Sequence, residues 1–155
     1  MAAYRKIASG GHVKATRMTG CECCNFSEIT KKGSELKTGS VCPRCKNPTV
    51  RQFDSKAEFL RAQELKAMQE NGDIHSLAYQ PKFPLEVNKV FLYDFVADFC
   101  YNKDDEDGNE SFIVEDVKGF TGSGSKKRAI VTDVAKMKMA HFEAQYGIPV
   151  QIIMR

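Results

Sequence analysis

The stretch Val114-Glu115-Asp116-Val117-Lys118-Gly119 decides the expected fold, because it sets three charged residues into a segment that otherwise has the composition of a buried β-strand. Alternate residues of a strand share a face, so Asp116 and Lys118 point to one side and Glu115 points to the other. A β-bulge would shift this register and turn Glu115 toward the first side instead. We therefore expect a functional face on this strand, carried by Asp116 and Lys118 in the favoured register.

A second predicted strand, residues 90–101, carries Asp98 and is joined to the first by the acidic segment 102–109. That segment contains Gly and Asn and predicts a turn, so the two strands are expected to pair as a hairpin. The hairpin would bring the carboxylates of Asp98 and Asp116 together, and a divalent cation would relieve their repulsion. Hard carboxylate oxygens favour Mg²⁺ or Mn²⁺, and the amine of Lys118 could orient a water or stabilise charge on a phosphate.

The other elements follow from propensity and turn chemistry. Good helix formers run from residue 55 to 70 and stop at Asn71-Gly72, while an apolar stripe at helical spacing predicts a second helix over 132–146. Segments rich in β-branched or aromatic residues predict further strands over 74–80, 83–87 and 148–154. Residues 119–128 indicate a flexible loop with a basic end. The order is αβββαβ or close to it, so we expect an α/β fold with a mixed sheet flanked by helices.

The cysteines predict a zinc site. The pairs Cys21-x-x-Cys24 and Cys42-x-x-Cys45 are separated by seventeen residues, which is a spacing typical of four-thiolate zinc sites. Cys23 is surplus in this assignment, and its use in place of Cys21 suits the two-residue spacing less well. A segment this short buries little core, so metal ligation would supply its folding energy. We therefore expect a small zinc ribbon that holds one structural Zn²⁺.

The charges are distributed unevenly along the chain of 155 residues. Residues 1–52 hold ten Lys or Arg against three Glu, whereas residues 53–155 hold thirteen Lys or Arg against seventeen acidic residues. Because Lys and Arg bind phosphates, the basic N-terminal part predicts a nucleic-acid partner, contacted by the arm or by the ribbon. We expect three parts: a flexible basic arm over 1–20, the zinc ribbon over 21–52 and a larger domain over 53–155.

No segment approaches the roughly 18 consecutive apolar residues of a membrane span, and the first residues lack the apolar core of a signal peptide. These features predict a soluble, cytoplasmic protein with no membrane partner. A further basic cluster is either a solvated face or a phosphate contact. Its members are Lys126, Lys127, Arg128, Lys136 and Lys138.

Five short motifs in sequence order make residues 53–155 resemble a small phage and prophage family of the PD-(D/E)XK nuclease superfamily. They are Phe53-Asp54-Ser55-Lys56-Ala57-Glu58, Gln80-Pro81-Lys82-Phe83, Ala97-Asp98-Phe99, Val114-Glu115-Asp116-Val117-Lys118-Gly119 and Tyr146-Gly147-Ile148. The resemblance implies a restriction-endonuclease-like fold, similar to that of phage endonuclease I-type junction resolvases. It implies that Glu58, Asp98 and Asp116 are metal ligands and that Lys118 is the catalytic lysine, with Gln80 lining the site.

The resemblance also implies a function: a Mg²⁺- or Mn²⁺-dependent endonuclease that hydrolyses phosphodiester bonds in branched or structured DNA, as a Holliday junction resolvase does in recombination. A homodimer is expected by the same analogy, in the host cytoplasm if the protein is phage-encoded. Two alternatives stay open, a nuclease acting on ordinary duplex or invading DNA, and a non-catalytic zinc-ribbon DNA-binding protein. Glu58 has a structural alternative too, because it could close a capping box with Ser55. Ala97 stands where the superfamily name has Pro.

Overall fold

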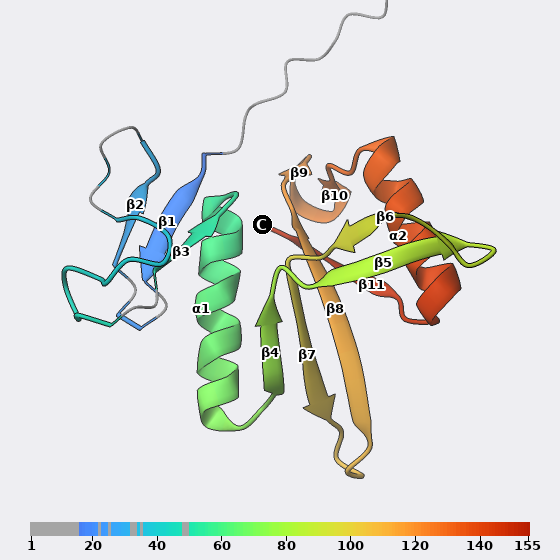
Figure 1. Cartoon of the computed structure of the whole chain (residues 1–155), viewed down its shortest axis with the longest axis horizontal. Coiled ribbons are helices and arrows are strands. Elements are labelled where there is room, and N and C mark those ends of the chain that lie inside the picture. The colour runs from blue at the N-terminus through green and yellow to red at the C-terminus, as the bar shows by residue number, and fades with distance from the viewer. Residues whose placement is uncertain (1–15, 22, 25, 32–33, 35, 48–49) are drawn as a thin grey trace, which may run out of the picture.

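The structure is a computed structural model that describes residues 16–155 apart from 22, 25, 32–33, 35 and 48–49 (Figure 1). Most of the expected arm, residues 1–15, therefore lies outside the described residues. The last residues of the expected arm belong to a strand instead, because β1 spans Met18–Cys21.

The N-terminal part is a three-stranded antiparallel sheet. Its strands are β1, β2 (Ser27–Ile29) and β3 (Val50–Phe53), in the order β2-β1-β3. A small core of Cys21, Leu36, Cys42 and Val50 is buried beneath it, and Cys24 and Cys45 pack against this core. The cysteines therefore form part of the interior of this unit.

Helix α1 (Lys56–Asn71) follows β3 after two residues, Asp54 and Ser55. Ser55 caps the helix, since its side chain accepts a hydrogen bond from the backbone N–H of Glu58, and Gly72 ends it in the left-handed conformation with φ 84°. These ends agree with those predicted from the sequence, because both signals are local.

A mixed four-stranded sheet forms the centre of the molecule. Its strands are β4 (His75–Tyr79), β7 (Phe99–Asp104), β8 (Glu110–Lys118) and β11 (Val150–Met154), in the order β11-β8-β7-β4. Strand β11 runs parallel to β8, and the other neighbours are antiparallel. Helix α2 (Asp133–Tyr146) connects to β11 through the left-handed Gly147. Over residues 56–155 the described chain thus has a mixed α/β fold, as expected, and its two α-helices and the strands of this sheet follow in the order α1, β4, β7, β8, α2, β11 (Figure 1).

The two faces of the sheet contribute to two hydrophobic cores. Phe99 and Tyr101 of β7 pack with α1, whereas Cys100, between them, packs with Met139 and Phe142 of α2. This alternation is what the two-residue period of a strand requires. None of the helices in the described part of the chain is both long enough and apolar enough to span a membrane.

A hairpin interrupts the order between β4 and β7, and it corrects one expectation. Strands β5 (Lys82–Val87) and β6 (Val90–Val96) pair only with each other among the described strands, so the prediction of one continuous strand over 90–101 was wrong. The chain breaks at Ala97 and Asp98 because Ala97 packs in the core with α2 while Phe99 packs in the core with α1. Two residues of one strand at that spacing would share a face.

The segment 119–128 is also more structured than expected. It forms a short hairpin of β9 (Phe120–Thr121) and β10 (Arg128–Ala129), with a 3₁₀ turn, η1 (Gly124–Lys126), between them. Gly122 has φ 89°, and a Cβ there would lie 2.4 Å from the carbonyl oxygen of Lys126. Since only glycine fits such a position, Gly122 allows the tight turn of this hairpin.

Candidate active site

The candidate site lies at one end of the central sheet, where α1 begins, β4 and β8 end and β7 starts (Figure 1). Two backbone hydrogen bonds join these ends across the strands. The N–H of Gln80 donates to the carbonyl of Asp98 at 2.9 Å, and the N–H of Asp98 donates to the carbonyl of Glu115 at 3.1 Å. The break between β6 and β7 is therefore held in a fixed position beside the end of β8.

Asp98 occupies this break and points toward β8. Its Oδ2 accepts a hydrogen bond from the backbone N–H of Val117 at 2.6 Å. Burial, together with the carboxylates of Glu58 and Asp116, raises the pKa of Asp98 to about 8, although the Val117 hydrogen bond and the charge of Lys118 act in the opposite direction. The four predicted side chains thus interact electrostatically, and the carboxylates among them repel one another.

Asp116 and Lys118 lie on the same face of β8, as the strand period predicted. The amine Nζ of Lys118 lies 2.8 Å from Oδ1 and 2.7 Å from Oδ2 of Asp116. Asp116 is buried and Lys118 is partly exposed. Lys118 thus forms an ion pair with the buried carboxylate of Asp116.

Glu58 reaches the site from the first turn of α1. Its Oε2 accepts from the N–H of Asp54 at 2.9 Å and its Oε1 accepts from the hydroxyl of Ser55 at 3.1 Å. Glu58 therefore helps to cap the helix, as the structural alternative predicted, but the backbone donor is Asp54 and not Ser55, the N-cap residue that a capping box uses. Burial raises the pKa of Glu58, and these two hydrogen bonds oppose the rise. Each carboxylate oxygen has a second lone pair, so the capping role leaves Glu58 able to bind a cation.

The structure places Gln80 beside these acidic groups, in a narrow pocket that the ribbon strand β3 also lines. The pocket is lined by Arg51, Gln52, Phe53, Glu58, Tyr79, Gln80, Asp98 and Phe99. Gln80 has φ 49°, an uncommon conformation for a residue with a side chain. Arg51 and Gln52 were not identified from the sequence, because a polar residue in a short ribbon strand carries no signal of its neighbours in space.

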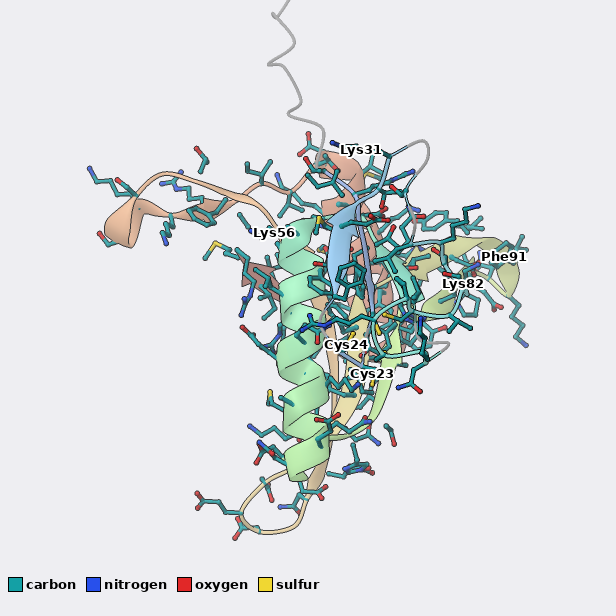
Figure 2. The ribbon with its side chains drawn as sticks, turned by 90° about the vertical axis from the view of Figure 1, so that its left-hand side faces the viewer. Cys23, Cys24, Lys31, Lys56, Lys82 and Phe91 are labelled. Carbon is teal, nitrogen blue, oxygen red and sulfur yellow. The ribbon has the colours of Figure 1, made fainter. Side chains whose placement is uncertain are left out.

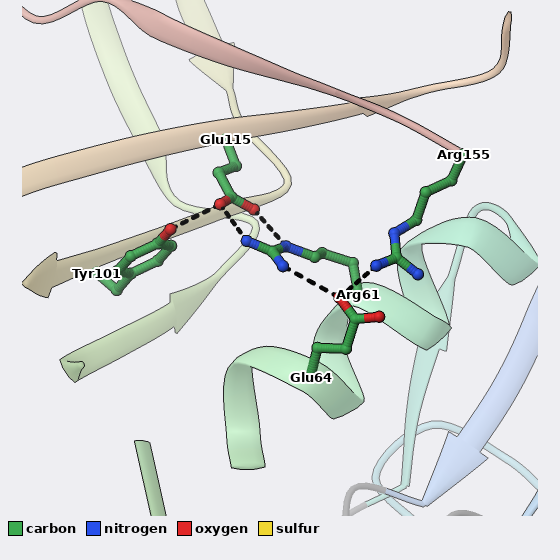
Figure 3. A network of polar contacts seen from close by, with 5 residues as sticks. All are labelled: Arg61, Glu64, Tyr101, Glu115 and Arg155. Atoms are coloured by element: carbon green, nitrogen blue, oxygen red, sulfur yellow. Dashed lines mark hydrogen bonds and ion pairs between the residues drawn. The ribbon is translucent and has the colours of Figure 1, made fainter. Parts of the chain in front are cut away.

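Glu115 does not belong to this site. It is 1% exposed, on the opposite face of β8, where Arg61 of α1 donates from Nε at 2.9 Å and from Nη2 at 2.6 Å to its two oxygens (Figure 3). The hydroxyl of Tyr101 donates to the same carboxylate at 2.7 Å. Burial raises the pKa of Tyr101, and the hydrogen bond to Glu115 raises that of Arg61. The bulge that would have turned Glu115 toward the site is not present in β8, whose pairing with β7 is regular.

The polar network continues from Arg61 to the end of the chain. Nη1 of Arg61 donates to Glu64 at 3.0 Å, and Arg155 pairs with the same carboxylate (Figure 3). The backbone N–H of Arg155 donates to the carbonyl of Lys118 at 3.1 Å. Helix α1, strand β8 and the end of β11 are thus joined directly behind the candidate site.

The four predicted zinc ligands are clustered in the ribbon. The Sγ atoms of Cys21, Cys24, Cys42 and Cys45 all lie within 4.8 Å of one another, with 3.5 Å between Cys21 and Cys45 and 3.7 Å between Cys24 and Cys42. A tetrahedral ion with Zn–S bonds of about 2.3 Å would set its sulfurs roughly 3.8 Å apart, so this cluster could hold a zinc ion. Cys23 is exposed and outside the cluster, and its sulfur accepts a hydrogen bond from Asn47 at 3.0 Å.

Two other groups of polar residues are less convincing as metal sites. The four thiols of the ribbon lie within 4.8 Å of one another. Within the described residues, the carboxylate oxygens of Glu58, Asp98 and Asp116 do not all meet this distance. His75, Asp104 and Glu110 do meet it, at the opposite end of the sheet, but all three are exposed. An exposed His and Glu pair 2.7 Å apart is stable without an ion, so we assign no role to this second group.

The predicted basic cluster divides into two sets. Lys126, Lys127 and Arg128 are exposed on the β9–β10 hairpin, which begins two residues after Lys118, and the amine of Lys127 lies 4.4 Å from the centre of the Phe120 ring. The two lysines of α2, in contrast, contact neighbouring groups of the protein: Lys136 pairs with Asp133, and Lys138 lies over the ring of Tyr93.

Residues 47–153 match the family model described as "Protein of unknown function (DUF1064)". No curated protein and no solved structure matches the chain. The matched region begins before β3, so it includes the last ribbon strand together with Glu58, Asp98, Asp116 and Lys118.

Proposed function

The chain belongs to the DUF1064 family, and on the chemistry of its site we propose that it is a Mg²⁺- or Mn²⁺-dependent endodeoxyribonuclease with a restriction-endonuclease-like fold. The proposal rests on one observation: the side chains of Asp98, Asp116, Glu58 and Lys118 interact at one end of a mixed sheet. The order αβββαβ around that sheet supports the proposed fold.

The acidic groups have the donor chemistry that a divalent cation prefers, and their oxygens would have to move closer together for all three to bind one ion directly. Carboxylate oxygens are the ligands that Mg²⁺ and Mn²⁺ prefer, and the raised pKa of Asp98 reflects burial and repulsion that a cation would relieve. Asp98 and Asp116 would hold the ion, with Glu58 as a further ligand. When bound, such a cation would supply the charge that activates a water and neutralises a phosphate during hydrolysis.

The protein groups divide the remaining work. The Val117 N–H fixes one oxygen of Asp98, so the carboxylate is oriented before any ligand arrives. Lys118 provides an amine beside Asp116 that could turn to a phosphate oxygen or hold a water, and either contact stabilises the charge that develops on the phosphate. The capping hydrogen bonds of Glu58 fix its side chain at the start of α1.

We extend the proposal to the ribbon and to the substrate. The four clustered thiols support one structural Zn²⁺ on Cys21, Cys24, Cys42 and Cys45. Resemblance to junction resolvases supports branched or structured DNA as the preferred substrate and a homodimer as the active form. Ordinary duplex or invading DNA is the alternative substrate for the same chemistry.

Incubating the purified protein with linear, flapped and four-way DNA, with Mg²⁺ or with EDTA, tests the proposal. We expect Mg²⁺-dependent cuts that EDTA prevents, most rapidly on the branched substrates. Equal rates on all three substrates would reject the branch preference and keep the nuclease. Binding to DNA without any cut, with either Mg²⁺ or Mn²⁺, would favour the non-catalytic zinc-ribbon protein instead.

A further inference from the structure

Two exposed apolar side chains lie beside the candidate site on β11, the edge strand of the central sheet in the order β11-β8-β7-β4. Strand β11 runs parallel to β8, with Ile152 paired with Asp116 and Met154 paired with Lys118. Residues paired in this way point to the same face of a sheet, and neighbouring strands lie about 4.8 Å apart. Ile152 and Met154 therefore flank the proposed metal ligand and the proposed catalytic lysine.

Packing within the described chain does not account for the apolar character of these two positions. Earlier on the same face, Val114 of β8 and Val150 of β11 pack in the core beneath α2. Ile152 and Met154 lie outside the three hydrophobic cores of the described residues, and they are 41% and 45% exposed. Exposed edge strands commonly carry charged side chains, which prevent unwanted pairing. Two apolar side chains at such an edge, next to a charged site, instead indicate contact with a ligand.

We propose that Ile152 and Met154 form an apolar ledge that packs against the sugar next to the phosphate being cut and selects deoxyribose over ribose. The inference rests on the proposed nuclease function. Each phosphate within a DNA strand is bonded to a sugar on either side, so a phosphate held by Lys118 and by a cation on Asp116 brings a sugar to the neighbouring strand β11. The 2′ side of a deoxyribose is apolar, and Ile and Met side chains can cover it without leaving a polar group unpaired.

The ledge discriminates because a ribose carries one more hydroxyl. The 2′-hydroxyl is the group by which proteins distinguish RNA from DNA. Against Ile152 and Met154 this hydroxyl would lose contact with water and would find no strong hydrogen-bond partner in either side chain. An apolar surface rejects an added hydroxyl only moderately, so we expect a preference of roughly tenfold and not complete exclusion. The proposed preference for DNA would then have a cause in the side chains of β11.

Cleavage of the DNA that the wild type cuts best, compared with the same DNA carrying one ribonucleotide on either side of the cut, tests the ledge. For the wild type, kcat/KM should be roughly tenfold lower with the ribonucleotide on the side that meets the ledge. Ile152→Thr keeps the branching at Cβ and Met154→Gln keeps the length, but each adds a hydrogen-bonding group, so each should reduce this preference to less than about threefold. Met137→Gln is the matched control, since Met137 is an exposed methionine of α2 that does not pair with β8, and it should keep the full preference.

A sugar with a 2′-fluorine separates the hydroxyl from the shape of the sugar, because it favours the pucker of ribose but cannot donate a hydrogen bond. The wild type should cut this substrate like DNA, and the melting temperature of each variant confirms that it folds.

Three results would overturn the ledge and leave the nuclease intact. The first is an equal preference in the two ledge variants and in Met137→Gln, and the second is poor cleavage of the fluorinated substrate by the wild type. The third is a wild type that is a dimer and ledge variants that are monomers with an unchanged preference, since a second copy of the chain would then cover Ile152 and Met154. A wild type that cuts no DNA would overturn both the ledge and the nuclease.

Discussion

Replacing Arg61 by methionine should destabilise the protein strongly, because it leaves a buried carboxylate without its cation. Arg61 supplies two of the three hydrogen bonds that Glu115 accepts, at 2.9 and 2.6 Å, and Tyr101 supplies the third at 2.7 Å. Glu115 is 1% exposed, so water cannot replace the lost donors. Methionine keeps the length of the aliphatic part of arginine but lacks the charge and the donors of the guanidinium.

The magnitude follows from what remains around Glu115. Removing one partner of a buried ion pair costs about 3–5 kcal/mol, and the surviving hydrogen bond from Tyr101 favours the lower end of that range.

Urea unfolding of the zinc-loaded protein, followed by circular dichroism, measures this free energy. Lys136→Met is the control, since it removes one partner of an exposed helical pair, Lys136 with Asp133 at 3.1 Å, and should cost less than about 1 kcal/mol. A loss below about 1 kcal/mol for Arg61→Met would refute the reasoning. It would mean that Glu115 is not held as a buried charge by α1.

Three further outcomes are expected. Metal analysis should find one Zn²⁺ per chain. The zinc should be retained in Cys23→Ser and lost in Cys42→Ser, because Cys42 belongs to the thiol cluster and Cys23 does not. Less than half an equivalent of zinc in the folded wild type would reject the site. Residues 1–15 precede β1 and hold three Lys or Arg. Deleting them should reduce the slope of log affinity for DNA against log salt by up to about 3, because fewer counterions are released. An unchanged slope would show that these residues do not contact phosphate. In metal-free buffer Asp98→Asn should stabilise the fold by on the order of 1–2 kcal/mol at pH 8.5. The pKa of Asp98 is raised to about 8 in the folded protein, so the stability of the wild type falls as the pH rises from about 4 through 8. Asparagine stays neutral and avoids this loss. The gain should shrink toward pH 5, and urea unfolding that shows no gain at pH 8.5 would contradict the cause assigned to the shift.

The helix ends could be predicted because their signals are local. Ser55 and Gly72 bound α1, and Thr132 and Gly147 bound α2, at the residues where capping and left-handed glycine chemistry place them. The placement of Asp116 and Lys118 on one face of β8 could be predicted in the same way, because alternate residues of a strand share a face.

The rest depended on contacts between residues distant in sequence. The break at Asp98 arises because its two neighbours belong to different cores, which no alternation pattern within residues 90–101 reveals. The partner of Glu115 is 54 positions away on α1, and Arg51 meets Tyr79 only because the ribbon packs beside the sheet. Figure 2 shows this packing from the ribbon side, with the ribbon in front of the sheet and Lys56 at the start of α1.

Single-turnover cleavage of DNA in Mg²⁺ by the wild type, Asp98→Asn and Lys118→Ala tests the central proposal most directly. Asp98→Asn removes a charge from the proposed cation site, and its rate should fall by orders of magnitude while DNA binding persists. Lys118→Ala should lose on the order of 10²–10³ in rate, the usual loss when one donor to transition-state charge is removed. Circular dichroism checks that both variants fold. Near wild-type rates for both folded variants would contradict the proposed nuclease site.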